Sequence, residues 1–171
     1  MMRWAWLMAP VLLALSGCAS LDPAAALRAA ARSLNFHLEA VRPRLDIAFP
    51  LERSALVIAV DLGVENGSNL RLAARALGGN IRLDSAGSSF PLGQLHFPAG
   101  VTLDPTSRRT VRAELRLPYG EVRNAWKALE SVALKGGAGT WKLDGAATVD
   151  LLGVPLQVPL RTSLHTGTPR P

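Results

Sequence analysis

The two-residue period of the apolar side chains is the feature that most constrains the fold of this chain. In SALVIAVDLGVEN, every second position from Leu56 to Val64 is aliphatic, and the positions between them include Ala59, Asp61 and Gly63. Successive side chains of a β-strand point to opposite faces, so this alternation predicts a strand with one buried face.

Segments with the same period recur along the chain. They are LNFHLEAV (34–41), RLDIAFPLE (44–52), NLRLAARAL (69–77), NIRLD (80–84), LGQLHF (92–97), RTVRAELRLPY (109–119), TWKLDGAATVDLL (140–152) and VPLQVPLRTSL (154–164). In RLDIAFPLE the apolar side, which we expect to be buried, includes Ile47, Phe49 and Leu51. Because proline cannot donate to a ladder, Pro155 and Pro159 predict that the last strand lies at a sheet edge or contains a bulge.

One segment has a helical period instead. In GEVRNAWKALESVAL, the residues Val122, Trp126, Leu129 and Ala133 follow the spacing i, i+4, i+7, i+11, which places them on one face of a helix. Seven or eight strands with Gly-, Ser- and Pro-rich turns favour a sandwich. The predicted class is therefore mainly β: an antiparallel β-sandwich (immunoglobulin/fibronectin III-like) with one interposed α-helix. Glycine pairs such as Gly78-Gly79 are interpreted as turns.

The N-terminus has the pattern of a secretory signal. A short positive start, MMR, precedes the uncharged run WAWLMAPVLLAL (4–15), which is too short to span a bilayer as a helix. The next residues, LSGC (15–18), resemble the lipobox of bacterial lipoproteins, which implies cleavage before Cys18 and acylation of its thiol. Two alternatives are an ordinary signal peptide that contains a cysteine, and a small buried thiol of the mature domain.

These patterns divide the chain into four parts. Residues 1–17 are the predicted lipoprotein signal peptide, 18–33 a partly helical tether, 34–165 the sandwich domain and 166–171 a disordered tail. In the tether, Asp22 is a candidate N-cap and Pro23 fits the first helical position, but no wide apolar stripe follows. Ala19 after the cysteine resembles lipoproteins sorted to the outer rather than the inner membrane. We therefore expect a cell-envelope location, lipid-anchored on the periplasmic face of the outer membrane.

The charge of the chain gives only weak information about partners. It has 19 Lys and Arg against 13 Asp and Glu, a net charge of +6 that becomes +5 once Arg3 is removed. This charge favours anionic headgroups or lipopolysaccharide, or is simply a dispersed soluble surface. The expected partners are the membrane, through lipid on Cys18, and an envelope protein or lipid. Nucleic acid is not expected, because no aromatic residues interleave with the basic ones.

No catalytic or metal-binding constellation is visible in the sequence. His37, His96 and His165 are far apart, and none belongs to a metal-ligand or nucleophile motif. Asp61 and several other acids occupy outward strand positions. Trp126 and Trp141 fall on apolar faces and are expected in the core. We therefore expect no enzyme, no cofactor and no metal. The acids at outward strand positions are Asp46, Asp61, Asp144 and Asp150.

The stretch ALVIAVDLGVENGSNLRL resembles the late-embryogenesis-abundant type 2 family, also called the water stress and hypersensitive response (WHy) domain. The similarity extends from about Arg44 to Ser163 and implies a small antiparallel sandwich with one helix, often in lipoproteins, and a role in desiccation and other stress. The family usually has Asn-Pro-Asn after the long strand, whereas this chain has Asn66-Gly67-Ser68-Asn69. Asn66 and Asn69 are interpreted as a structural turn motif rather than a binding site.

Two functional hypotheses follow. The first is a non-enzymatic, lipid-anchored envelope protein whose sandwich binds or protects envelope components under stress. The alternative is an adaptor in envelope assembly or transport that binds a protein partner through a sheet edge.

Overall fold

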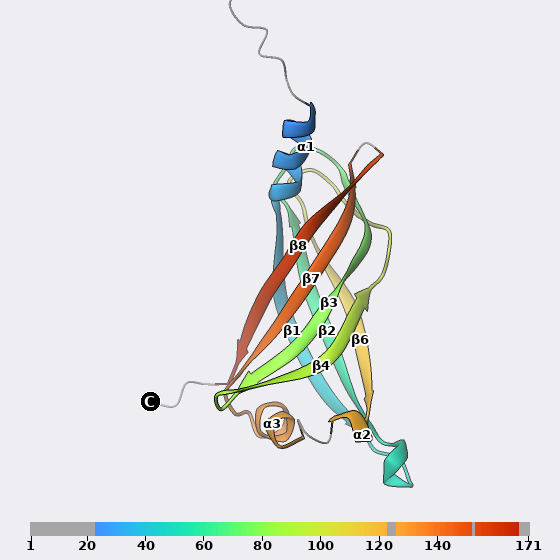
Figure 1. Cartoon of the computed structure of the whole chain (residues 1–171), viewed down its shortest axis with the longest axis vertical. Helices are drawn as coiled ribbons and strands as arrows, with labels where there is room; N and C mark the ends of the chain where they lie inside the picture. Colours follow the sequence, from blue (N-terminus) through green and yellow to red (C-terminus); the bar gives the residue numbers. More distant parts are fainter. Residues whose placement is uncertain (1–22, 123–125, 152, 168–171) are drawn as a thin grey trace, which may run out of the picture.

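The computed structural model describes residues 23–122, 126–151 and 153–167 and confirms the predicted β-sandwich (Figure 1). One sheet has the order β1-β2-β6; the other has the order β4-β3-β7-β8, with β5 also paired to β3. All pairings are antiparallel. The strands are β1 (Leu34–Asp46), β2 (Ala55–Asn66), β3 (Leu72–Ser85), β4 (Ser88–Phe97), β5 (Val101–Leu103), β6 (Arg108–Pro118), β7 (Gly139–Leu151) and β8 (Val154–Thr166).

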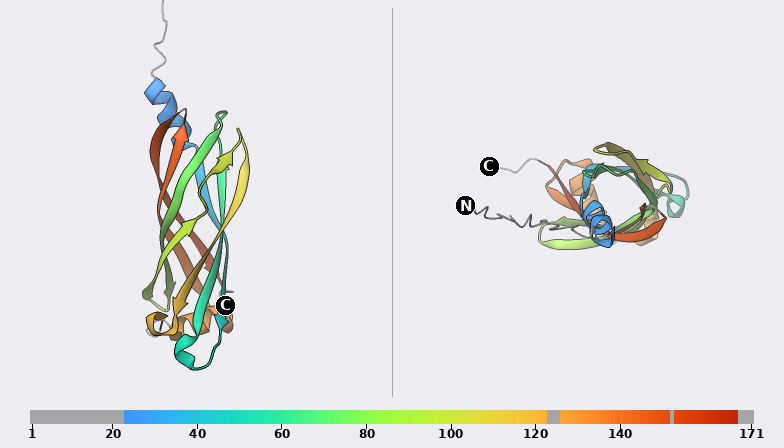
Figure 2. Two further views of the ribbon diagram at one scale, coloured as in Figure 1. Left: turned by 90° about the vertical axis from the view of Figure 1, so that its right-hand side faces the viewer. Right: turned by 90° about the horizontal axis from the view of Figure 1, so that it is seen from above.

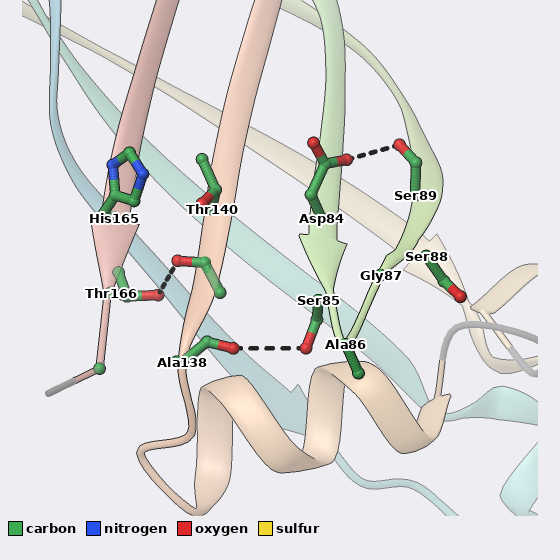
Figure 3. Close-up of a pocket in the computed structure, with 12 residues that line it drawn as sticks. Asp84, Ser85, Ala86, Gly87, Ser88, Ser89, Ala138, Thr140, His165 and Thr166 are labelled. Carbon is green, nitrogen blue, oxygen red and sulfur yellow. Dashed lines mark hydrogen bonds between the residues drawn. The ribbon is translucent and has the colours of Figure 1, made fainter. Parts of the chain in front are cut away.

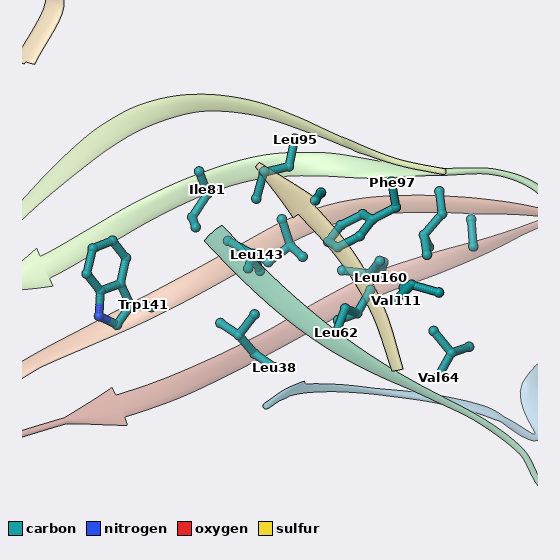
Figure 4. Packing of buried hydrophobic residues seen from close by; sticks show 14 of the residues in the cluster. Leu38, Leu62, Val64, Ile81, Leu95, Phe97, Val111, Trp141, Leu143 and Leu160 are labelled. Atoms are coloured by element: carbon teal, nitrogen blue, oxygen red, sulfur yellow. The ribbon is translucent and has the colours of Figure 1, made fainter. Parts of the chain in front are cut away.

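The core lies between the two sheets, and β2 contributes the face predicted from its alternation. Ile58, Val60 and Leu62 are fully buried there, as are Leu143 of β7 and Leu160 of β8 in the facing sheet. Figure 4 shows Leu62, Leu143 and Leu160 meeting in the interior. Burial of apolar surface contributes about 25 cal/mol per Å² and is the main stabilising term of such a sandwich.

Proline occurs in each of the four long edge strands and in none of the central strands. The edge strands β1, β4 and β6 contain Pro43, Pro91 and Pro118, and β8 contains Pro155 and Pro159. The central strands β2, β3 and β7 have no proline, since each must donate to neighbours on both sides. The prediction that the last strand lies at an edge is therefore confirmed.

The expected burial of Ile47 and Phe49 is wrong. Strand β1 ends at Asp46, which pairs with Ala55 at the start of β2, so no partner strand extends beyond this point. Ile47 and Phe49 are 65% and 83% exposed in the connection that leads to the short 3-10 helix η1 (Leu51–Arg53). Alternation identifies two sides of a segment, but burial requires a facing sheet that reaches it.

The segments NLRLAARAL and NIRLD form one strand, β3, rather than two strands. A bulge between Ala74 and Ala76 shifts the register, so Leu77 is buried in place of Ala76. The interpretation of Gly78-Gly79 as a turn is also wrong. Gly79 pairs with Gly145 of β7, and a Cβ atom on either would collide with the backbone of the facing strand. Because neither residue has a side chain, the backbones of the neighbouring strands β3 and β7 can approach closely at this pair.

Helical segments cover the two ends of the sandwich. At one end, α1 (Pro23–Arg32) lies within the predicted tether, and its Ala30 is buried in the core, so this part of the tether belongs to the folded body. At the other end lie α2 (Tyr119–Val122), α3 (Trp126–Leu129) and the π-helical turn η2 (Glu130–Leu134) (Figures 1 and 2). This is the predicted interposed helical segment, and residues 123–125 lie outside the described residues. We call the two ends the α1 end and the distal end.

Asn66 is the centre of the turn between β2 and β3. It is fully buried, and its Nδ2 donates to the carbonyl oxygens of Leu70 (2.8 Å) and Asp104 (2.9 Å). Its Oδ1 accepts hydrogen bonds from the backbone N (3.0 Å) and Oγ (2.7 Å) of Ser68. Asn69 is exposed. Asn66 and Ser68 therefore join this turn to the connection that follows β5.

Replacing Asn66 with Ala should lower the free energy of unfolding by about 2–4 kcal/mol, because it leaves buried carbonyl groups without a donor. Asn69→Ala is the matched control and should change it by no more than about 0.5 kcal/mol. Urea unfolding of the two variants measures both values. Equal losses would show that the Asn66 hydrogen bonds do not hold the turn.

Candidate functional site

A small apolar pocket of about 150 Å³ opens at the distal end. Its walls come from the end of β1, the start of β2, and helices α2 and α3. The rings of Tyr119 and Trp126 meet edge to face, with centroids 5.7 Å apart. Of the two hydroxyl-bearing side chains in the lining, Ser54 and Tyr119, the Ser54 hydroxyl exchanges hydrogen bonds with the backbone of Ala48. The lining residues are Leu45, Ile47, Ser54, Ala55, Leu56, Tyr119, Val122 and Trp126.

The rim of this pocket is apolar and exposed. Ile47 and Tyr119 line it, Tyr119 is 40% exposed, and Phe49 lies two residues after Ile47 in the same connection. Clustered exposed apolar side chains on a folded domain are typical of interaction sites. We call Ile47, Phe49, Tyr119 and the pocket the distal apolar site. Trp126, predicted in the core, is only partly buried and forms one of its walls.

A second, polar cleft of about 610 Å³ lies at the same end, over the ends of β3, β4, β7 and β8 (Figure 3). One cross-strand row runs through it: Ser89 pairs with Asp84, Asp84 with Thr140, and Thr140 with His165. Ser89 Oγ donates to Asp84 Oδ1 (2.5 Å), and Lys142 Nζ lies 2.6 Å from Asp84 Oδ2. The hydrogen bonds from Lys142 and Ser89 hold the pKa of Asp84 below its ordinary value.

The sequence did not reveal this row, and its geometry does not form a catalytic relay. Asp84 and His165 are two strands apart, about 10 Å at the usual strand spacing, so His165 cannot hydrogen-bond this carboxylate. His37 lies on β1, 3.6 Å from Glu65, and His96 lies on β4. Within the described part of the chain, no group of three or more His, Cys, Asp or Glu is placed to hold a metal ion.

Asp61 was predicted at an outward position, and the structure shows it outward but covered. Arg112 Nε donates to its Oδ1 (2.6 Å) and Arg42 Nη1 to its Oδ2 (2.5 Å). The hydrogen bond from Arg112 is the largest cause of a lowered pKa at Asp61, and Arg42 adds to it. Both carboxylate oxygens are occupied from the neighbouring strands, so this cluster joins β1, β2 and β6 rather than binding a ligand.

Glu39 extends the same charge layer along the sheet. Its carboxylate accepts hydrogen bonds from Arg108 and from Thr110 Oγ1 (2.9 Å), which together lower its pKa. The side chain crosses β2 at Gly63, where a Cβ atom would collide with the carboxylate. A side chain at position 63 would therefore require the Glu39 carboxylate to shift.

The predicted lipidation residue, Cys18, lies outside the described residues, and Asn66 and Asn69 lie at the α1 end. None of the helices in the described ranges has the length and apolar character needed to cross a membrane. Of the distal apolar site, the sequence identified the apolar residues but assigned Ile47 and Phe49 to a buried face. Pro50 gives no signal for the end of β1, because this edge strand continues through Pro43.

Comparisons with known proteins show a shared fold and no family. No family model matches the chain, and no curated protein matches it. The solution structure of AT1g01470 from Arabidopsis thaliana is 16% identical with a TM-score of 0.50, covering 78% of this chain and 80% of that one. At this identity the likeness shows the fold alone.

Two further structures are similar at lower scores. A protein from Archaeoglobus fulgidus is 16% identical with a TM-score of 0.43, covering 78% of this chain and 98% of that one. A candidate late embryogenesis abundant (LEA) protein, At2g46140.1, is 11% identical with a TM-score of 0.43, covering 86% of each chain.

Acid should remove the stabilisation that Asp61 provides. A carboxylate with a lowered folded-state pKa stabilises the fold fully above its unfolded pKa, about 3.9, and loses this contribution as pH falls through the folded value. We expect Asp61→Asn to lower the free energy of unfolding at pH 7, with the deficit shrinking below about pH 4. Urea unfolding of both chains at pH 7, 5, 4 and 3 measures it. A deficit that is the same at every pH would contradict the charge assignment.

Proposed function

We propose that this protein is a non-enzymatic, lipid-anchored protein of the bacterial envelope that binds a partner through the distal apolar site. The observation that carries the proposal is the exposure of Ile47 and Phe49 beside an apolar pocket, at the end of the sandwich opposite α1. The proposed anchor, Cys18, precedes α1 by five positions, so it would tether the α1 end of the sandwich.

The length of the sandwich makes this arrangement directional. Strands β1, β7 and β8 each have 13 residues, which corresponds to about 43 Å at 3.3 Å per residue. An anchor at the α1 end would therefore hold the distal apolar site roughly that far from the membrane surface. Its apolar residues would face the periplasm, where a protein or a lipid carried away from the bilayer can meet them.

The absence of catalysis is part of the proposal. The polar cleft offers an aspartate and a histidine on strands that are separated by a third, and the Asp61 and Glu39 carboxylates are occupied by arginines. Assignment to the LEA type 2 (WHy) family rests on the resemblance of ALVIAVDLGVENGSNLRL, and the sandwich that this resemblance implies agrees with the fold. A stress-protective role follows from the same resemblance.

The alternative, an adaptor that binds through a sheet edge, is less well supported. An added strand needs a continuous row of free backbone donors and acceptors. Each of the long edge strands β1, β4, β6 and β8 is interrupted or ended by proline, and β1 contains a bulge between Leu38 and Ala40. In addition, Thr162 Oγ1 of β8 accepts a hydrogen bond from the Leu38 backbone N (3.0 Å), which joins two edges. These features oppose pairing with another chain.

A double variant tests the distal apolar site. Ile47→Ser with Phe49→Ser should leave the free energy of unfolding within about 0.5 kcal/mol per substitution, because both side chains are exposed. It should abolish crosslinking to envelope partners and fail to restore survival of drying and osmotic shock in a deletion strain. The control, Gln94→Ser with His96→Ser, removes two exposed side chains of β4 that lie away from the distal apolar site, and it should retain both activities. Loss of neither activity in the distal variant would refute the site.

Metabolic labelling with palmitate tests the anchor. The wild-type chain should incorporate label and sediment with membranes, and Cys18→Ser should do neither, because the thiol is the proposed acylation site. An unlabelled wild-type chain would rule out the lipid anchor and the envelope placement that depends on it.

A further inference from the structure

The α1 end presents a groove that combines positive charge with apolar walls. The groove has a volume of about 440 Å³ and lies between α1 and the first half of β8. Arg28 and Arg32 are one helical turn apart and both exposed, so they project on the same side of α1. The groove residues are Arg28, Ala31, Arg32, Leu34, Leu156, Gln157, Val158 and Pro159.

The charge of these two arginines is not neutralised by the acids around them. Of the carboxylates at this end, Asp104 forms an ion pair with Arg71 and Asp150 with Arg75. The carboxylate of Glu65 lies 3.6 Å from the imidazole of His37. In the described ranges, neither Arg28 nor Arg32 forms an ion pair, and α1 contains no acidic residue. Two guanidinium groups are thus available to an external anion.

Exposed apolar residues lie at the same end. Leu70 of the turn between β2 and β3 is 38% exposed, and Val154, the first residue of β8, is 43% exposed. A backbone hydrogen bond from Gly67 N to Ser33 O (3.0 Å) places the turn between β2 and β3 against the end of α1. Cationic groups beside apolar side chains fit the headgroup region of a bilayer, where phosphates and the first methylenes lie close together.

We propose that the α1 end is a membrane-contact surface, in which Arg28 and Arg32 bind the phosphates of anionic phospholipids and Leu70 and Val154 enter the headgroup layer. The short distance in sequence between the proposed acylation site and α1 identifies the bilayer as the partner of this surface. The proposed acylation site, Cys18, is five residues before Pro23, and five residues reach at most about 18 Å. This inference rests on the proposed anchor: a chain tethered there holds the α1 end against the bilayer. The basic groove then fixes the orientation of the sandwich.

Vesicle sedimentation tests the surface without the anchor. The chain 18–171 carrying Cys18→Ser retains the whole described fold, whose first buried residue is Ala30. It should partition onto vesicles of 30% phosphatidylglycerol in phosphatidylcholine, and weakly onto pure phosphatidylcholine. Arg28→Gln with Arg32→Gln should weaken partitioning about 25-fold, since each basic residue near an anionic surface contributes about a factor of five.

The matched control is Arg44→Gln with Arg53→Gln, which removes the same charge from two exposed arginines away from the α1 end. It should change partitioning less than threefold. Leu70→Ser with Val154→Ser should weaken it on both kinds of vesicle. Equal losses from the two arginine pairs would show attraction by net charge alone and overturn the proposal, as would absence of vesicle binding. Because no acyl chain is present, this outcome is independent of palmitate labelling, which decides the anchor itself.

Discussion

The packing of one sheet face against the other is the interaction on which the whole structure depends. The inward side chains of β2 meet those of β7 and β8, and residues such as Ile58, Leu62, Leu143 and Leu160 have no exposed surface. With a single cysteine in the chain, an internal disulfide is excluded, so this apolar burial must supply most of the stability. Apolar and polar residues alternate along the strands because each sheet buries one face and exposes the other.

A two-layer sandwich leaves two kinds of boundary that need separate solutions. Along the sides, prolines interrupt the edge strands and remove backbone donors, which limits pairing with other chains. At the ends, short helical segments close the core, with Ala30 covering one end and Val122 and Leu129 the other. Neither cover is complete. The groove beside α1 and the distal apolar site are two surfaces that these covers leave open.

The outer face of the smaller sheet shows how charge supports the same architecture. Asp61 and Glu39 lie over the central strand and accept hydrogen bonds from arginines on β1 and β6, so three strands are joined by side chains as well as by backbone. Outward alternation in the sequence predicted the positions of such residues but not their pairing. Pairing depends on register, which brings Asp61 opposite Arg112, and register is a property of two segments rather than one.

By itself the sequence determined the class of fold, most of the strands, the edge position of β8 and the helical segment before β7, because each follows from local periodicity or from the chemistry of proline. Only the tertiary structure decided how far each strand continues and what covers it. It joined two predicted strands through the bulge in β3, placed Gly79 against Gly145 inside the sheet, and left Ile47 and Phe49 exposed where β2 no longer accompanies β1. The physical reason is that burial belongs to a pair of facing surfaces: a segment specifies its own apolar side, whereas the partner that covers it, or fails to, comes from elsewhere in the chain.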